Sequence, residues 1–202
     1  MRWRLIDKVS VTISALLVSS SATFIFLYLA VPAVNVSVPR VEVVVPLTVP
    51  AVVSVTTPVQ LDIASIKVST SVTPVGLTKD GDMAIDDNAE RVAWYQFGAK
   101  PGEGGSAVIA GHYGWKDGVA SVFNDLNTLE LGDEVTTTDA EGHVQNFVVK
   151  RISMYAPEQD ATDVFKSDDG KAHLNLITCQ GIWNNAAKTY SERLVVFTDL
   201  VE

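Results

Sequence analysis

The chain has a single cysteine, Cys179, among its 202 residues, and only three histidines. One cysteine cannot form an intramolecular disulfide, so the fold must be stabilised by packing alone. One cysteine and scattered histidines also make no metal ligand set, and neither a metal nor another cofactor is expected. A phosphate-binding glycine loop and internal repeats are absent as well. The formal net charge of −9 argues against nucleic acid as a partner, because phosphate binding requires basic patches.

Charged residues are missing from residues 9–31. This run is long enough for a membrane-spanning helix, which takes roughly 20 residues. Basic side chains precede it, and the positive-inside rule then places residues 1–8 in the cytoplasm and the rest of the chain outside. The alternative is a cleaved signal peptide, but the apolar run continues past the small residues at 19–22, which favours an uncleaved anchor. The sequence therefore predicts a single-pass protein of the cell membrane with an extracellular C-terminal domain.

Residues 32–58 are rich in valine, proline and threonine. Four prolines, Pro39, Pro46, Pro50 and Pro58, would each interrupt a central strand, so an extended extracellular tether is predicted. An edge strand packed on the domain is the alternative. Residues 59–202 are predicted to form the folded domain.

Short apolar, β-branched segments recur through this domain, with few helical patterns between them. Strands are predicted at 61–68 with one irregularity, 106–110, 134–138, 144–152, 174–179 and 194–201, and the aromatic segment 92–97 is predicted to anchor the core. A short helix is predicted at 120–131, from apolar residues at helical spacing, and a helical turn at 161–165 within a long polar loop. This pattern is typical of a mostly-β barrel or sandwich.

The stretch 174–200 carries the candidate chemistry. Cys179 ends one predicted strand and Arg193 starts the next, on either side of a polar loop. If the two strands pair, the thiol and the guanidinium share one end of the sheet, an arrangement suited to acyl transfer. The alternatives are a buried, inert cysteine and an arginine paired with Glu192 or Asp199 on the surface.

Three histidines compete as the acid–base partner of Cys179. His143 lies in a predicted hairpin turn and is expected to be solvated. His173 precedes Cys179 by six positions on the same strand, roughly 20 Å away at about 3.3 Å per residue. His112 follows a buried strand and Gly111, and it is favoured by elimination.

The residues around these candidates resemble those of sortases, the cysteine transpeptidases of Gram-positive surfaces. The resemblance covers about residues 60–200. Its motifs are Ala110-Gly111-His112, Leu176-Ile177-Thr178-Cys179 and Tyr190-Ser191-Glu192-Arg193-Leu194-Val195-Val196, and they look most like class F or class E sortases of Actinobacteria and related lineages.

The resemblance implies an eight-stranded sortase-type β-barrel behind one transmembrane helix. It implies Cys179 as nucleophile, His112 as acid–base and Arg193 as oxyanion or substrate stabiliser, with Thr178 and Ala110 in the substrate-binding pocket. The implied reaction cleaves an LPxTG-like signal between Thr and Gly. The partners implied are surface proteins with a C-terminal sorting signal and an amine acceptor, from a peptidoglycan precursor or a pilin. Loops 155–172 and 180–192 would frame the groove.

Other readings remain open from the residues alone. An L,D-transpeptidase is the nearest enzymatic alternative, although the Ser-His-Gly-Cys-type run of that family is missing around Cys179. A catalytically silent wall-binding module is the alternative from another class. Asp168 and Asp169 suggest a calcium site, but a solvated acidic loop is favoured over it. Asn175 stands where the family has threonine, which is expected to tune substrate fit.

Overall fold

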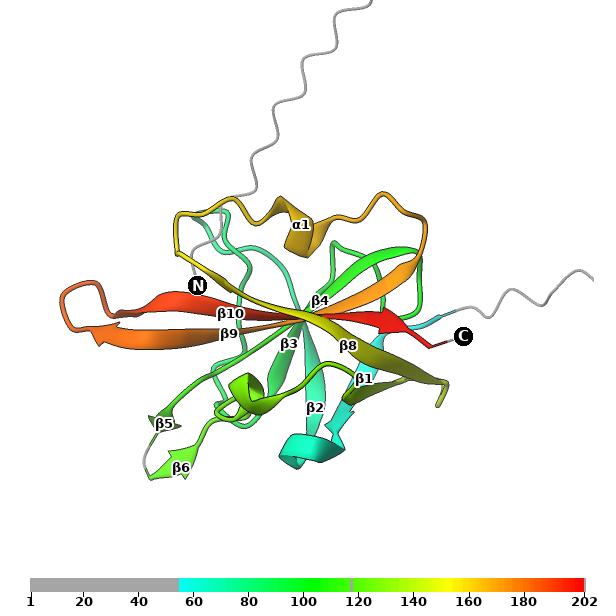
Figure 1. The fold of residues 1–202 in the computed structure, drawn as a ribbon, viewed down its shortest axis with the longest axis horizontal. Helices are drawn as coiled ribbons and strands as arrows, with labels where there is room; N and C mark the ends of the chain where they lie inside the picture. Colours follow the sequence, from blue (N-terminus) through cyan, green and yellow to red (C-terminus); the bar gives the residue numbers. More distant parts are fainter. Residues whose placement is uncertain (1–54, 117, 202) are drawn as a thin grey trace, which may run out of the picture. The chain divides into compact units, whose positions relative to one another are not determined.

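A computed structural model describes residues 55–116 and 118–201. Within them, eight strands close into a barrel in the order β1-β2-β3-β4-β9-β10-β8-β7 (Figure 1). The barrel strands are β1 (Pro58–Ile63), β2 (Val68–Val75), β3 (Val92–Tyr95), β4 (Gly105–Gly111), β7 (Glu134–Asp139), β8 (Val144–Tyr155), β9 (Ala172–Asn184) and β10 (Thr189–Leu200). The predicted eight-stranded, mostly-β barrel is confirmed.

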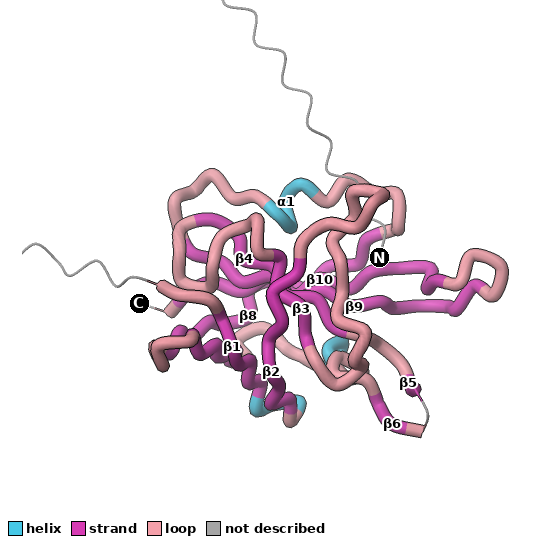
Figure 2. Tube along the Cα trace, turned by 180° about the vertical axis from the view of Figure 1, so that it is seen from behind, coloured by secondary structure: helices cyan, strands magenta, loops and turns pink. Residues whose placement is uncertain are grey.

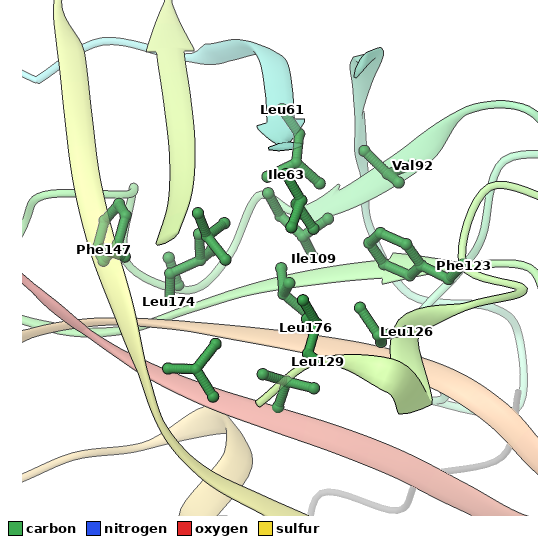
Figure 3. Packing of buried hydrophobic residues seen from close by; sticks show 14 of the residues in the cluster. Leu61, Ile63, Val92, Ile109, Phe123, Leu126, Leu129, Phe147, Leu174 and Leu176 are labelled. Carbon is green, nitrogen blue, oxygen red and sulfur yellow. The ribbon is translucent and has the colours of Figure 1, made fainter. Parts of the chain in front are cut away.

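Alternating side chains fill the barrel, as the period of two along a strand requires. Leu61 and Ile63 of β1, Ile109 of β4 and Leu174 and Leu176 of β9 are all fully buried in one cluster. Figure 3 shows these side chains converging from different strands. The intervening residues of β4, β9 and β10 face the outside of the barrel.

A second apolar cluster covers that outer face of β4, β9 and β10. Val108, Ile177 and Val195 supply it from the sheet, and Val164 of the short helix α1 (Thr162–Phe165) packs on them. In both views the helix lies outside the strands, at the upper side of the barrel (Figures 1 and 2). The predicted helical turn at 161–165 is therefore confirmed, and its buried face explains why one turn persists in a polar loop.

Two local predictions are wrong. The predicted strand 61–68 is two strands, β1 and β2, separated by a 3-10 turn (Ala64–Ile66), and Lys67 takes a left-handed conformation with φ 57°. The predicted helix 120–131 is instead a loop with a 3-10 turn at Leu126–Thr128. Its apolar residues Phe123 and Leu126 are fully buried in the barrel core. Polar residues of this loop bond locally, with the Thr128 hydroxyl donating to the carbonyl of Asp125, which competes with helix formation.

The predicted polar loop 180–192 is mostly strand. β9 continues to Asn184 and β10 begins at Thr189, so the pair forms a long hairpin. Gly181, with φ 85°, lies beside a register shift between Tyr190 and Glu192 and does not end its strand. A second, two-stranded hairpin, β5 (Trp115–Lys116) with β6 (Val119–Ala120), projects from the same side of the barrel (Figure 1, Figure 2).

The predicted cytoplasmic segment 1–8, membrane anchor 9–31 and nearly all of the tether 32–58 lie outside the described residues. Among residues 55–116 and 118–201, no helix has the length and apolar content needed to cross a membrane.

Candidate active site

Cys179 and Arg193 lie directly opposite each other in the antiparallel register of β9 and β10. The expected pairing of these two strands is confirmed. Arg193 is not at a strand start, however, because β10 begins four positions earlier at Thr189. β4 runs parallel to β9 with Ala110 against Ile177, and His112 follows β4 by one residue as the chain leaves the barrel. Three residues from distant parts of the sequence thus reach the same end of the sheet.

A cavity of about 590 Å³ contains all three of these residues in its wall. Its wall is formed by Ile85, Ala89, Gly111, His112, Tyr113, Trp115, Ser121, Cys179, Trp183, Lys188, Thr189, Tyr190 and Arg193. The β9–β10 hairpin therefore frames the cavity, as expected. The other loop expected there, 155–172, contributes no lining residue. Its place is taken by residues 111–121 and by the segment around Ile85 and Ala89.

The ring of His112 is oriented by the backbone of that segment. Its Nε2 lies 2.7 Å from the carbonyl oxygen of Asp86. A carbonyl oxygen only accepts hydrogen bonds, so Nε2 carries the proton and Nδ1 of the neutral ring keeps its lone pair. Asp86 is itself held in place, because its carboxylate accepts hydrogen bonds from the Thr73 hydroxyl (2.6 Å) and the Asn88 amide (2.8 Å). These bonds, led by that of Thr73, lower the pKa of Asp86.

Gly111 gives the backbone its tight approach before His112. A Cβ at this position would lie 2.5 Å from the Phe123 ring. The next residue accepts a backbone hydrogen bond from Phe123 at 3.0 Å, which keeps the buried phenyl ring against the strand end. The Phe123 ring therefore leaves no room for a side chain at position 111, which is why the close backbone approach expected there requires glycine.

Arg193 is buried, with only 2% of its surface exposed. Its Nη1 donates to the carbonyls of Tyr190 (3.1 Å) and Glu192 (2.9 Å), and its Nη2 donates to the Thr189 hydroxyl (2.9 Å). Its Nε is buried without a hydrogen-bond partner. Neither alternative carboxylate pairs with it: Glu192 contributes only its backbone, and Asp199 bonds His173. A buried cation held by neutral groups favours an anionic guest or developing negative charge.

The two residues expected to bind substrate, Thr178 and Ala110, are buried at 0% and 1% exposure, and neither lines the cavity. The Thr178 hydroxyl donates to the carbonyl of Gly111 at 2.8 Å, across 67 positions of sequence. This bond ties the strand of Cys179 to the residue before His112. Asn175 is also buried and donates to the carbonyl of Val164 at 2.6 Å, so it fastens α1 to β9.

The other two histidines lie elsewhere. His143 follows the β7–β8 turn, its side chain 42% exposed, and bonds the carboxylate of Asp139 at 3.0 Å. His173 shares β9 with Cys179 but sits near its opposite end, where Nδ1 bonds Asp199 at 2.8 Å and Nε2 bonds Asp169 at 3.0 Å. Asp169 is thus a histidine partner, and no group of three or more potential metal ligands occurs among residues 55–116 and 118–201.

This His173 bridge predicts a pH-dependent stability. Partial burial acts to lower the pKa of His173, but the hydrogen bonds that its ring donates to the carboxylates of Asp169 and Asp199 outweigh it and raise the pKa above the usual 6.5. A raised histidine pKa stabilises the fold below about pH 6.5 and loses that effect as the pH rises through the folded-state value. The advantage in melting temperature of wild type over His173→Gln should therefore be larger at pH 5.5 than at pH 9, by up to about 4 °C. Thermal melts at both pH values measure it, and an equal advantage would contradict the charged bridge.

Four aromatic residues of the cavity were not singled out as site residues from the sequence, although two of them lie in the segment 180–192 that was expected to frame the groove. Tyr190 packs edge-on against Tyr113 (centroids 5.2 Å apart) and Trp183 (5.1 Å), while Trp115 is 71% exposed at the rim. The available signal was an aromatic pair, Trp183 and Tyr190, in a stretch otherwise polar and flanked by Cys179 and Arg193. Nothing in the sequence could have pointed to Asp86, because it orients His112 through its backbone carbonyl, which every residue has.

A closed barrel that carries Cys, His and Arg around one cavity defines a class of thiol-dependent acyl-transfer enzymes. Residues 61–201, more than half of the chain, match the family model of the Sortase domain. The chain belongs to the sortase family, whose members are cysteine transpeptidases. No curated protein matches its sequence.

Solved sortase structures share the fold. Sortase C-1 from Actinomyces oris is 27% identical, with 71% of this chain and 73% of that chain covered and a TM-score of 0.56. Sortase A from Corynebacterium diphtheriae is 24% identical, with 73% and 62% covered and a TM-score of 0.56. Sortase C1 from Streptococcus agalactiae, in a complex with MTSET, is 23% identical, with 72% and 69% covered and a TM-score of 0.57. The last two likenesses concern the fold alone, and the class F or class E resemblance stays a prediction.

Proposed function

We propose that this sortase cleaves an LPxTG-like sorting signal between threonine and glycine and transfers the acyl group to an amine of a cell-wall precursor or pilin. The observation that carries the proposal is the register that sets Cys179 against Arg193, at a cavity that His112 also lines. Surface proteins with a C-terminal sorting signal are then the acyl donors. The class F or class E assignment belongs to the same proposal.

The proposed reaction has two steps. His112 takes the thiol proton of Cys179 at Nδ1, because Nε2 is committed to the carbonyl of Asp86. The sulfur then bonds to the threonine carbonyl carbon, the bond to the glycine nitrogen breaks, and His112 returns the proton to that departing amine. In the second step the incoming amine bonds to the same carbon, the carbon–sulfur bond breaks, and a proton of the amine passes through His112 to the sulfur of Cys179, which restores the thiol.

Arg193 is proposed to stabilise the negative charge that each step places on the carbonyl oxygen. Its Nε is a buried donor without a partner, and its other donors fix the guanidinium in place. A donor fixed before the reaction costs no reorganisation when the charge develops. Its planar group keeps its charge at any working pH.

A peptide cleavage assay tests the proposed activity. The full chain in detergent is incubated with a library of LPxTG-like peptides, and mass spectrometry follows Cys179. We expect an adduct carrying the peptide up to threonine and release of the glycine-led fragment, with no adduct on Cys179→Ala. A chain whose Cys179 reacts with a thiol reagent but forms no adduct with any peptide would contradict the proposal.

We also propose that residues 9–31 anchor the protein in the cell membrane by a single pass, with the catalytic domain outside. The support is the uncharged run and the basic residues before it. Since Cys179 is the one cysteine, a membrane-impermeant thiol reagent reports on the side of the membrane without further substitution. Labelling of intact cells is expected, and labelling only after lysis would overturn the topology.

A further inference from the structure

The charged residues that line the cavity, Lys188 and Arg193, are both basic, and none of the lining residues is Asp or Glu. The whole chain has the opposite balance, with 24 acidic and 15 basic residues. A low-dielectric cavity lined by cations raises the local concentration of anionic ligands. The bias is therefore local to the cavity.

Lys188 is the cation of this cavity that the proposed chemistry does not use. It belongs to the turn between β9 and β10, directly before Thr189. Its backbone is left-handed, with φ 51°, a conformation that a lysine adopts at a steric cost and that glycine or asparagine takes more readily. It forms no salt bridge within residues 55–116 and 118–201. A strained turn thus presents an unpaired cation to the cavity.

The position of Lys188 separates it from the reacting atoms. It precedes Arg193 by five positions, which corresponds to roughly 16 Å along an extended strand. Tyr190 lies between them along the strand, paired with Trp183, and its ring packs in T-shaped contacts with those of Trp183 and Tyr113. A ligand in contact with both Arg193 and Lys188 must pass these rings and extend over several residues.

We propose that Lys188 binds a carboxylate on one of the two peptide-like substrates, several residues from the reacting carbonyl or amine, and thereby selects acidic substrates. The carboxylate belongs either to the sorting-signal peptide or to the amine acceptor. This inference rests on the proposed transpeptidation, because it concerns the substrates of that cavity.

The test compares rates between matched substrates. The full chain is assayed with LPxTG-like peptides that carry glutamine at every position outside the motif, and with the same peptides after one Gln→Glu exchange at a time. Lysine and lysinamide, which differ in a carboxylate, serve as paired acceptors. The measured quantity is the ratio of kcat/KM for the acid to that for its amide, so a general loss of activity cancels.

Lys67 provides the matched control. Among residues 55–116 and 118–201 it is the other lysine with a left-handed backbone, at φ 57°, and it does not line the cavity. Lys188→Asn and Lys67→Asn both place a residue that accepts this conformation and remove one positive charge. Lys188→Glu reverses the charge at the cavity.

Wild type is expected to prefer the acid by roughly two- to five-fold for at least one peptide position or for the acceptor. The preference should disappear in Lys188→Asn, reverse in Lys188→Glu, persist in Lys67→Asn and weaken in high salt. A wild-type ratio near one for every pair, or a preference that survives in Lys188→Asn, would overturn the proposal.

A binding measurement separates this inference from the proposed reaction. The Cys179→Ala chain, with and without Lys188→Asn, is titrated with the same substrate pairs, and tryptophan fluorescence reports binding because Trp115 and Trp183 line the cavity. The ratio of dissociation constants should follow the same order without any turnover. Equal affinities for acid and amide in Cys179→Ala would reject the carboxylate site even where cleavage is observed.

Discussion

His112→Ala is expected to lose nearly all transpeptidation, by roughly 100- to 10,000-fold in kcat, because a positioned acid–base group contributes a factor of this size. The ring bonds Asp86 through Nε2 and keeps Nδ1 for the proton of the thiol and of the departing amine. Turnover of a sorting-signal peptide, followed by chromatography, measures the loss. The midpoint of thermal unfolding should change little, since the ring is only partly buried.

His143→Ala and His173→Ala are the matched controls. His143 bonds Asp139 at the β7–β8 turn, and His173 bridges Asp169 and Asp199 at the opposite end of β9 from Cys179. Both variants should keep most of the wild-type activity when assayed below their melting temperatures. Comparable losses in all three variants would show that the assignment of His112 is wrong.

Arg193→Ala is expected to slow acylation of Cys179 by roughly 100- to 1,000-fold, or about 2.7–4 kcal/mol, the usual effect of removing one fixed oxyanion donor. Arg193→Lys should fall between this variant and wild type, because lysine keeps the charge but loses the planar set of donors. Single-turnover formation of the thioacyl enzyme measures the step. Acylation at the wild-type rate by a folded Arg193→Ala chain would assign the stabilising role to another residue.

The burial of Arg193 makes folding the necessary control. Its loss removes three hydrogen bonds to Tyr190, Glu192 and Thr189, but it also removes a buried charge that has no carboxylate partner. These two effects oppose each other, so we expect Arg193→Ala to fold. Arg193→Met keeps the length of the side chain without its charge and separates packing from electrostatics. Circular dichroism and thermal melts of all three variants provide the comparison.

Local sequence patterns anticipated most of the barrel strands. The hairpin of β7 and β8 was recognised from the turn residues between two strand-like segments, and the strands around Ile109 and Leu176 from short apolar runs whose two faces are both buried. The helix predicted at 120–131 failed because its apolar residues serve the barrel core from a loop. The spacing of apolar residues along the sequence does not distinguish one face of a helix from loop side chains that are buried in the core of a barrel.

The cysteine, the arginine and the histidine were recognisable from the sequence because each is scarce and stands beside a strand-like segment. So was the family, through the short motifs around them. Their shared cavity was decided by the tertiary structure, since it depends on the pairing of β9 with β10 and on the parallel contact of β4 with β9. Such pairings join residues far apart in the chain, as Thr178 and Gly111 are, and no local pattern specifies them.

By itself, the sequence determined the chemistry that is available: one thiol, few histidines, a mostly-β domain and an acidic overall charge. Only the tertiary structure decided that Arg193 is buried with neutral partners alone among the described residues, that a backbone carbonyl orients His112, and that Lys188 shares their cavity. The physical reason is that burial, hydrogen-bond partners and local charge arise where the barrel closes. These properties depend on which strands lie next to each other, and no single stretch of residues determines them.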